Sequence, residues 1–167
     1  MTTKFAVPVN QRYFEDYVSG ASFEYGHITV SAEEIVEFAR RYDPQPIHID
    51  PEAAARGPFG GLIASGWHTA GVMMRLLGDN FISHVAGMAS PGVDELRWLL
   101  PVRPGDTLSI RVTVLEARRS RSKPDRGVVH SLVEVMNQKR EIVMTLKPVS
   151  IFRCRTSDAA ADREVSS

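Results

Sequence analysis

The sequence predicts an α+β domain in which one antiparallel sheet wraps around a central apolar helix. An apolar segment of helical length lies at 65–78, and four strand-like segments follow it in succession through hairpin-length connections. Strands that follow one another through hairpins pair antiparallel. A helix that is apolar on nearly all sides must be buried on most of them, and a curved sheet can provide that burial.

The first residues, 1–21, are expected to form an N-terminal arm ahead of a domain at 22–153. Tyr13, Phe14 and Tyr17 are spaced for one face of a helix. An irregular segment packed on the domain accounts for them equally well. The sequence leaves both alternatives open.

The domain begins with a strand and an amphipathic helix. Residues 22–30 are rich in strand formers and predict the strand. Ser31 is a good N-cap residue, and Glu34 three positions later completes a capping box. The helix must end before Pro44, because proline disfavours helical geometry in the residue before it. Its apolar face is predicted to comprise Ile35, Phe38, Ala39 and Tyr42.

A long connection rich in proline and glycine follows at 44–64. Within it, residues 51–56 predict a short helix, with Asp50 as its N-cap and Pro51 at its first position. Connections of this length in a compact domain are usually functional or disordered. The large apolar side chains favour an ordered segment; they are Ile47, Ile49, Phe59, Leu62 and Ile63.

The second half of the chain is predicted to be the rest of the sheet. Leu108 begins the clearest half-buried alternation, in which apolar and polar residues take turns. Residues 154–167 are expected to form a disordered tail, because 155–167 lack large apolar side chains apart from Val165. The strands are predicted at 93–100, 107–117, 128–137 and 141–152.

Length, composition and charge exclude several classes of protein. The 167 residues, 43% of them apolar, fit one domain with a real core. Twenty Lys and Arg balance twenty Asp and Glu, so the chain lacks the basic excess of nucleic-acid-binding proteins. Cys154 is the single cysteine, which excludes a disulfide framework and a multi-cysteine zinc site. Without a signal-peptide core or an apolar run of about 20 residues, we expect a soluble cytoplasmic protein.

The segment YDPQPIHID at 42–50 is the strongest candidate for chemistry. Asp43 and His48 place a carboxylate and an imidazole five residues apart, with two prolines between them that restrict the loop. Such a pair, held together, can bind one water molecule and move protons near neutral pH. Five residues span opposite faces of a strand and do not match one face of a helix, so a turn must unite the pair. The plain structural alternative is a helix-capping Asp43 and a hydrogen-bonded, partly buried His48.

Three motifs together resemble the MaoC-like dehydratases, or (R)-specific enoyl-CoA hydratases, which have the hot-dog fold. They are the segment DPQPIH at 43–48, the segment FGGLIASG at 59–66 and the turn PVRPGD at 101–106, in the family's order and spacing. The resemblance covers roughly 22–152. The predicted α+β architecture is therefore expected to be a single hot-dog domain.

The chain departs from the family pattern at two positions beside the candidate pair. Gln45 stands where the family usually has Asn, and Tyr42 where it often has Gly. Both departures leave Asp43 and His48 intact. They bear on the identity of the substrate more than on the chemistry.

The resemblance implies a hydro-lyase that reversibly adds water to a trans-2-enoyl thioester. Asp43 and His48 would hold the water, and Gly66 N–H, at the positive end of the central helix, would stabilise charge on the thioester oxygen, with Ser65 beside it as a substrate contact. Without the resemblance, tight helix packing would be the favoured explanation of Gly66. The family also implies a homodimer or larger oligomer, with no metal or redox cofactor and coenzyme A only as part of the substrate.

Two further sets of residues are candidates for substrate contacts. Ile63, Trp67 and Met74, with Met73 beside them, are expected to line the acyl pocket, and their size favours short or branched acyl chains. A basic stretch has two interpretations, a solvated hairpin loop or a contact for the phosphates of coenzyme A. It contains Arg118, Arg119, Arg121 and Lys123.

Two other functions remain as alternatives. A hot-dog acyl-CoA thioesterase would use Asp43 to activate water against the thioester carbonyl, and it has no need of His48. A non-catalytic acyl-CoA-binding subunit would be expected to have lost one of the two residues. Because both are present, hydration is favoured over either alternative.

Overall fold

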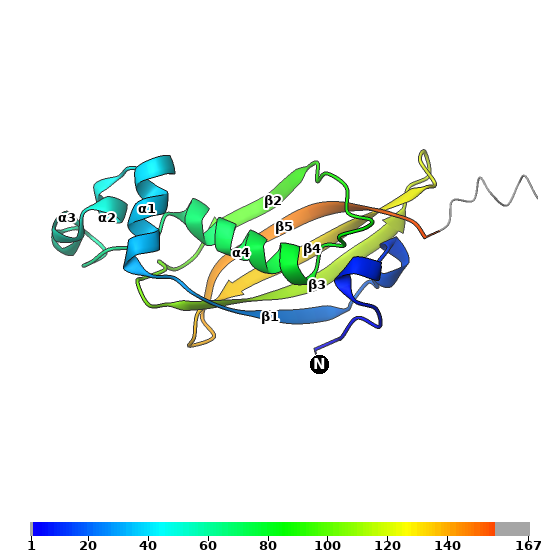
Figure 1. The fold of residues 1–167 in the computed structure, drawn as a ribbon, viewed down its shortest axis with the longest axis horizontal. Coiled ribbons are helices and arrows are strands. Elements are labelled where there is room, and N and C mark those ends of the chain that lie inside the picture. Colours follow the sequence, from blue (N-terminus) through cyan, green and yellow to red (C-terminus); the bar gives the residue numbers. More distant parts are fainter. Residues whose placement is uncertain (1, 156–167) are drawn as a thin grey trace, which may run out of the picture.

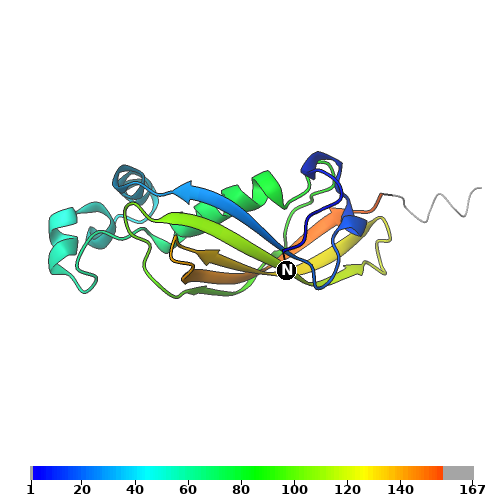
Figure 2. The same ribbon diagram turned by 90° about the horizontal axis from the view of Figure 1, so that it is seen from below.

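The computed structural model describes residues 2–155, and it contains one five-stranded antiparallel sheet with a long helix on it. The strand order is β1-β3-β4-β5-β2. Figure 1 shows helix α4 lying along the sheet, and Figure 2 shows that it covers one side of the curved surface. The strands are β1 (Ser22–Thr29), β2 (Gly92–Trp98), β3 (Thr107–Arg119), β4 (Arg126–Met136) and β5 (Ile142–Arg153). The predicted α+β class and the antiparallel pairing are confirmed.

Four α-helices precede β2, and their starts follow from local chemistry. The bounds are α1 (Ala32–Tyr42), α2 (Pro46–Ile49), α3 (Pro51–Arg56) and α4 (Gly66–Asn80). The predicted capping box at α1 is confirmed, because Ser31 Oγ accepts from Glu34 N–H at 3.1 Å while the Glu34 carboxylate accepts from Ser31 N–H at 2.9 Å. Asp50 caps α3 as predicted, accepting two backbone N–H bonds at 3.0 Å. The sequence analysis did not predict α2.

The core forms where α4 lies on the sheet. Leu108, Ile110, Val112 and Val114 have no exposed surface, which confirms the predicted alternation in β3. They belong to one apolar cluster with the buried apolar residues of α4, which are Met73, Leu76 and Leu77. Burial of these side chains is the main stabilising term of the fold.

Two expectations about burial were wrong. Helix α4 was expected to be covered on most sides, but Trp67 is 59% exposed and Met74 is 48% exposed within the described chain. The reason is geometric, since the sheet covers only one side of the helix. Tyr42, expected on the inner face of α1, is 61% exposed because the helix ends at this residue.

Of the two alternatives for the N-terminal arm, the structure shows the irregular segment packed on the domain. It contains two single-turn 3-10 helices, Val9–Gln11 and Phe14–Asp16. The Tyr17 ring stacks on Phe152 with centroids 4.0 Å apart, and its hydroxyl donates to the Phe81 carbonyl at 2.7 Å. Arg12 donates to the carbonyls of Asn80 and Phe81 at 2.9 Å each, so the arm caps the C-terminus of α4.

The first two residues of the predicted tail, Cys154 and Arg155, pack on the folded domain. Cys154 is buried, and its N–H donates to the Asp125 carbonyl at 2.8 Å. Arg155 donates to Asp16 at 2.7 Å. Both residues therefore belong to the folded body, and the rest of the predicted tail lies outside the described residues.

Candidate active site

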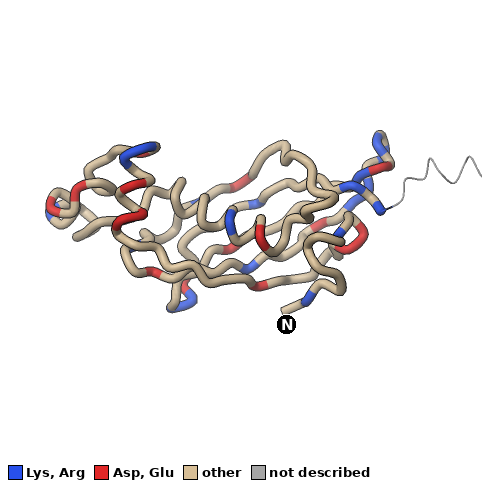
Figure 3. The backbone as a smooth tube through the Cα atoms, in the orientation of Figure 1, with Lys and Arg blue, Asp and Glu red and all other residues tan. Residues whose placement is uncertain are grey.

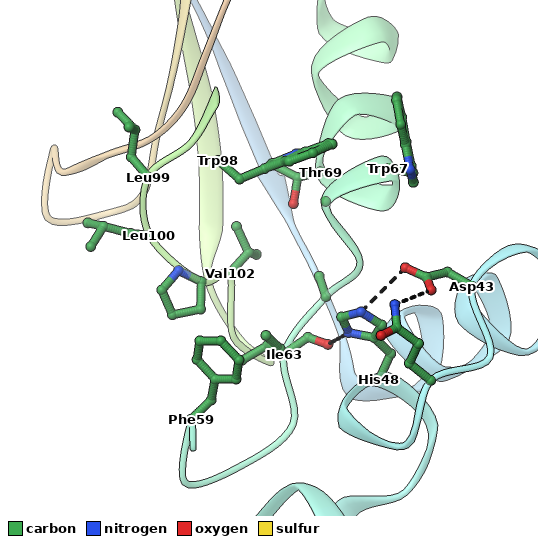
Figure 4. Close-up of a pocket in the computed structure, with 14 residues that line it drawn as sticks. Asp43, His48, Phe59, Ile63, Trp67, Thr69, Trp98, Leu99, Leu100 and Val102 are labelled. Atoms are coloured by element: carbon green, nitrogen blue, oxygen red, sulfur yellow. Dashed lines mark hydrogen bonds and ion pairs between the residues drawn. The ribbon is translucent and has the colours of Figure 1, made fainter. Parts of the chain in front are cut away.

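A cavity of about 410 Å³ lies where α4 begins, between α2 and the segment that follows β2. This volume falls within the range of small-molecule sites. Figure 4 shows Asp43 and His48 on one side of it and apolar side chains on the others. The lining residues are Asp43, Gln45, His48, Phe59, Ile63, Ala64, Gly66, Trp67, Thr69, Trp98, Leu99, Leu100, Pro101 and Val102.

Asp43 lies directly after α1 and is fixed by two donors. Ser65 Oγ donates to Asp43 Oδ2 at 2.6 Å, and Gln45 Nε2 donates to Asp43 Oδ1 at 2.7 Å. Hydrogen bonds to a carboxylate favour its charged form. These bonds, the one from Ser65 foremost, hold the pKa of Asp43 below its ordinary value.

His48 lies on α2 and is oriented by a backbone carbonyl. Its Nδ1 lies 2.8 Å from the Ile63 carbonyl oxygen, which can only accept a hydrogen bond, so Nδ1 carries the proton. In the neutral ring, Nε2 is then an acceptor, and it lies 3.4 Å from Asp43 Oδ2. The short helix α2 supplies the turn that brings the two residues together.

Helix α2 was missed because it is a single turn. Pro46 lies in this turn, where a missing N–H removes no helical hydrogen bond. Pro46, at the first position of the turn, was the available signal for it. The sequence pattern alone presents both prolines only as restrictions on a loop.

Ser65 was expected to contact the substrate, but it does not line the cavity. The residue is fully buried and is not among those that line the cavity. Its hydroxyl donates to Asp43 and also accepts from Trp67 N–H at 3.3 Å, as the N-cap of α4. Ser65 therefore positions Asp43 and starts the helix.

Gly66 lines the cavity in the first turn of α4, where a backbone N–H has no partner within the helix. The indole ring of Trp98 lies against its Cα, and a Cβ at this position would overlap the ring. The packing interpretation of Gly66 thus has a concrete basis. An alanine here would force the Trp98 ring to shift, whatever the Gly66 N–H binds.

The predicted acyl-pocket residues divide into two groups. Ile63 and Trp67 line the cavity, whereas Met74 does not and instead borders a second cavity farther along α4. The sequence analysis also missed the wall formed by Trp98 to Val102. The signal was the apolar run WLLPV directly before the turn at 101–106.

The basic stretch lies far from this cavity. Figure 1 places the β3–β4 hairpin at the opposite end of the sheet from α2 and α3, and Figure 3 shows the basic residues there. Arg118 lies 3.8 Å from Glu116, and Arg119 donates to the Pro124 carbonyl at 2.8 Å. The structure therefore does not bring Arg118, Arg119, Arg121 and Lys123 to the cavity of the same chain, and their contact with a phosphate stays a prediction. The chain folds the hairpin away from the cavity.

Within residues 2–155, no group of three or more His, Cys, Asp or Glu side chains is arranged to hold a metal ion. Over the same residues, no helix has the length and apolar character needed to cross a membrane.

Comparison with a family model gives a match over most of the chain. Residues 18–150 match the model described as "MaoC like domain". The match includes Asp43, His48 and Gly66.

Two curated relatives are similar in sequence. The uncharacterized protein YdeM of Bacillus subtilis is 31% identical over 131 residues, which are 75% of this chain and 87% of that protein. The 3-hydroxybutyryl-CoA dehydratase of Methylorubrum extorquens is 37% identical over 105 residues, which are 62% of this chain and 64% of that enzyme.

Two solved structures show the same architecture. The MaoC-like dehydratase from Rhodospirillum rubrum superposes with a TM-score of 0.79 at 40% identity, covering 87% of this chain and 99% of that one. The (R)-hydratase from A. caviae involved in PHA biosynthesis superposes with a TM-score of 0.66 at 25% identity, covering 80% and 95%. The expected hot-dog fold is thereby confirmed.

Proposed function

The chain belongs to the MaoC-like dehydratase family, and we propose that it reversibly hydrates acyl thioesters, interconverting trans-2-enoyl-CoA and 3-hydroxyacyl-CoA. One observation carries the proposal. Asp43 and His48 approach to 3.4 Å at the wall of a largely apolar cavity, beside the N-terminus of α4. This arrangement combines proton transfer, an apolar acyl environment and a site for negative charge.

The pair is suited to hold one water molecule. Asp43 Oδ2 and the neutral His48 Nε2 are both acceptors, so a single water can donate one hydrogen to each. The lone pairs of its oxygen then point away from both residues, toward the cavity. A substrate β-carbon in the cavity would meet them there.

We assign the role of base to His48. The donors Ser65 and Gln45 lower the pKa of Asp43, which makes its carboxylate a weak proton acceptor. In the proposed step, the water oxygen bonds to the β-carbon while His48 Nε2 takes a proton. The electron pair of the double bond moves toward the thioester oxygen, and the proton on His48 is then delivered to the α-carbon. The sum is the addition of one water to one double bond.

Gly66 N–H is the proposed donor to the thioester oxygen. It lies in the first turn of α4, where backbone N–H groups are free and the helix dipole is positive. A donor placed before reaction stabilises the enolate charge as that charge develops. We propose that the reaction needs no cofactor and that coenzyme A enters only as part of the substrate.

We also propose a homodimer joined through β2. This strand is at the edge of the sheet, and β5 is its one pairing partner within residues 2–155. Exposed apolar side chains flank it, Val93 and Trp98 on the strand and Met74 on α4. An exposed edge of this kind favours association with another chain. Light scattering should give twice the 18.5 kDa mass of one chain, and the mass of a single chain would contradict the dimer.

The activity is tested by loss of enoyl-thioester absorbance with crotonyl-CoA and trans-2-octenoyl-CoA, beside a free-thiol assay. We expect Asp43→Asn and His48→Ala to lower kcat by about 10²–10⁴-fold, the usual contribution of acid–base groups. Asp79→Asn is the matched control, because that carboxylate is exposed in a pair with Arg75 on α4. It should leave the rate unchanged.

Two results would contradict the hydratase. If the free thiol that forms accounts for all the enoyl-thioester absorbance that is lost, the protein is a thioesterase. No turnover of either substrate by folded protein would point to a binding subunit.

A further inference from the structure

A second cavity, of about 120 Å³, lies farther along α4 and is almost entirely apolar. Met73 and Leu77 border it from the helix, Val112 and Val133 from the sheet, and Val93 from β2. An apolar cavity of roughly this size can hold a small hydrocarbon. Nothing in the proposed reaction uses it.

The two cavities follow one face of α4. Thr69 lines the first and Met73 the second, and residues four apart lie on successive turns of the same face. On β2, Trp98 borders the first cavity and Val93 the second. A straight acyl chain entering past His48 and continuing along α4 would therefore run from one cavity toward the other.

Trp98 lies across that route. Figure 4 shows its indole ring extending from β2 to α4 at the level of Thr69, on the far side of the cavity from His48. The ring lies against Gly66, and its centroid is 5.2 Å from that of Trp67 in an edge-to-face contact at 80°. The indole is thus held between β2 and the start of α4.

We propose that Trp98 sets the length of the acyl chain, by closing the cavity on the side away from His48 and separating it from the second cavity. The substrate class is then a short-chain enoyl thioester, of about four carbons. This inference rests on the proposed hydratase activity and adds the residue that limits its substrate.

The test compares kcat/KM for crotonyl-CoA and trans-2-octenoyl-CoA. Wild type should prefer crotonyl-CoA, and Trp98→Ala should raise the octenoyl-to-crotonyl ratio by about tenfold or more, the discrimination that one methylene gives in an apolar pocket. Leu100→Ala is the control, because it enlarges the first cavity without opening the route along α4. Its ratio should stay within about threefold of wild type.

A second substitution tests whether the acyl chain of the substrate enters the second cavity. Met73→Phe places a larger side chain there, so Trp98→Ala combined with Met73→Phe should lose the gain in octenoyl-CoA turnover. Trp98 is 47% exposed, so its removal leaves no closed void in the core. If Trp98→Ala does not fold, Trp98→Leu replaces it in the same comparison.

The outcomes separate this inference from the activity itself. If wild type turns over neither thioester, the proposed function fails. If wild type is active but prefers octenoyl-CoA, or if folded Trp98→Ala keeps the wild-type ratio, the activity stands and the role of Trp98 is wrong. A ratio that rises equally in Leu100→Ala would also overturn it, because cavity size alone would then explain the change.

Discussion

Ser65 Oγ donates a 2.6 Å hydrogen bond to Asp43 Oδ2, and the same hydroxyl caps the first turn of α4. One side chain thereby joins the end of α1 to the start of the central helix. It also holds the pKa of Asp43 below its ordinary value. The proposed catalytic carboxylate and the proposed oxyanion donor, Gly66 N–H, are placed by the same residue.

Replacing Ser65 with alanine should raise the pKa of Asp43. The Ser65 hydroxyl is the foremost of the donors that favour the charged carboxylate, so its removal makes protonation of Asp43 easier. The lost cap should also lower the free energy of unfolding by about 1 kcal/mol. Ser31→Ala is the matched control, since it removes the N-cap of α1 with a similar loss of stability but should leave the pKa of Asp43 in place. An Asp43 carboxyl titration, followed by NMR, that does not move in Ser65→Ala would contradict the positioning role.

Gly66→Ala should destabilise the protein by about 1–3 kcal/mol, because the added methyl overlaps the Trp98 ring. Combining it with Trp98→Ala removes the overlap, so the double variant should be more stable than the sum of the single effects predicts. The alanine keeps its backbone N–H, so the double variant should still hydrate crotonyl-CoA. Additive losses in urea unfolding would show that the two residues do not interact.

The arm should stabilise α4 through Arg12. Its buried guanidinium donates to the carbonyls of Asn80 and Phe81, which Arg12→Met would leave without these donors. We expect a loss of about 2–3 kcal/mol in the free energy of unfolding, measured with urea. Arg75→Met provides the comparison, because Arg75 forms an exposed pair with Asp79, and it should cost about 0.5 kcal/mol or less. Equal effects of the two would be inconsistent with a capping role.

Stability on acidification should depend on Glu24. Arg140 and then Arg111 donate to its carboxylate and lower its pKa to about 2. Because the folded pKa lies below the ordinary value of 4.5, the stabilisation is present above about pH 4.5 and is lost as the pH falls toward 2. Glu24→Gln should thus lower Tm at pH 7 and approach the wild-type Tm near pH 2. Glu95→Gln, which removes an exposed single pair with Lys147, should leave Tm nearly unchanged at both pH values.

The sequence predicts features that depend on local chemistry. The capping box of Ser31 and Glu34 and the alternation beginning at Leu108 follow from hydrogen bonding and burial within a few residues. The approach of Asp43 to His48 was inferred only through a family resemblance. Residue spacing alone did not establish it, because the single turn α2 that unites them is too short to have a periodic pattern.

Tertiary arrangement explains where Met74 and Arg118 lie. Met74 is two turns beyond Gly66 on α4, and the Trp98 ring already closes the first cavity before that level. The basic hairpin at Arg118 has a composition suited to phosphate, but β3 carries it along the sheet to the opposite end. The place of Arg118 depends on the whole length of β3, and the place of Met74 relative to the cavity depends on Trp98, a side chain from another element. The residues next to Arg118 and Met74 in the sequence indicate neither.

The bond from His48 to the Ile63 carbonyl and the bond from Ser65 to Asp43 enclose the segment between them as a clasped loop. The proposed catalytic pair exists only while this loop is closed, whereas Val112 and Val133 are fully buried in strands of the sheet. Local opening needs less free energy than global unfolding. Warming should therefore switch off turnover while the sheet is still intact, and amide hydrogen exchange should be faster in the clasped loop than in β3 and β4.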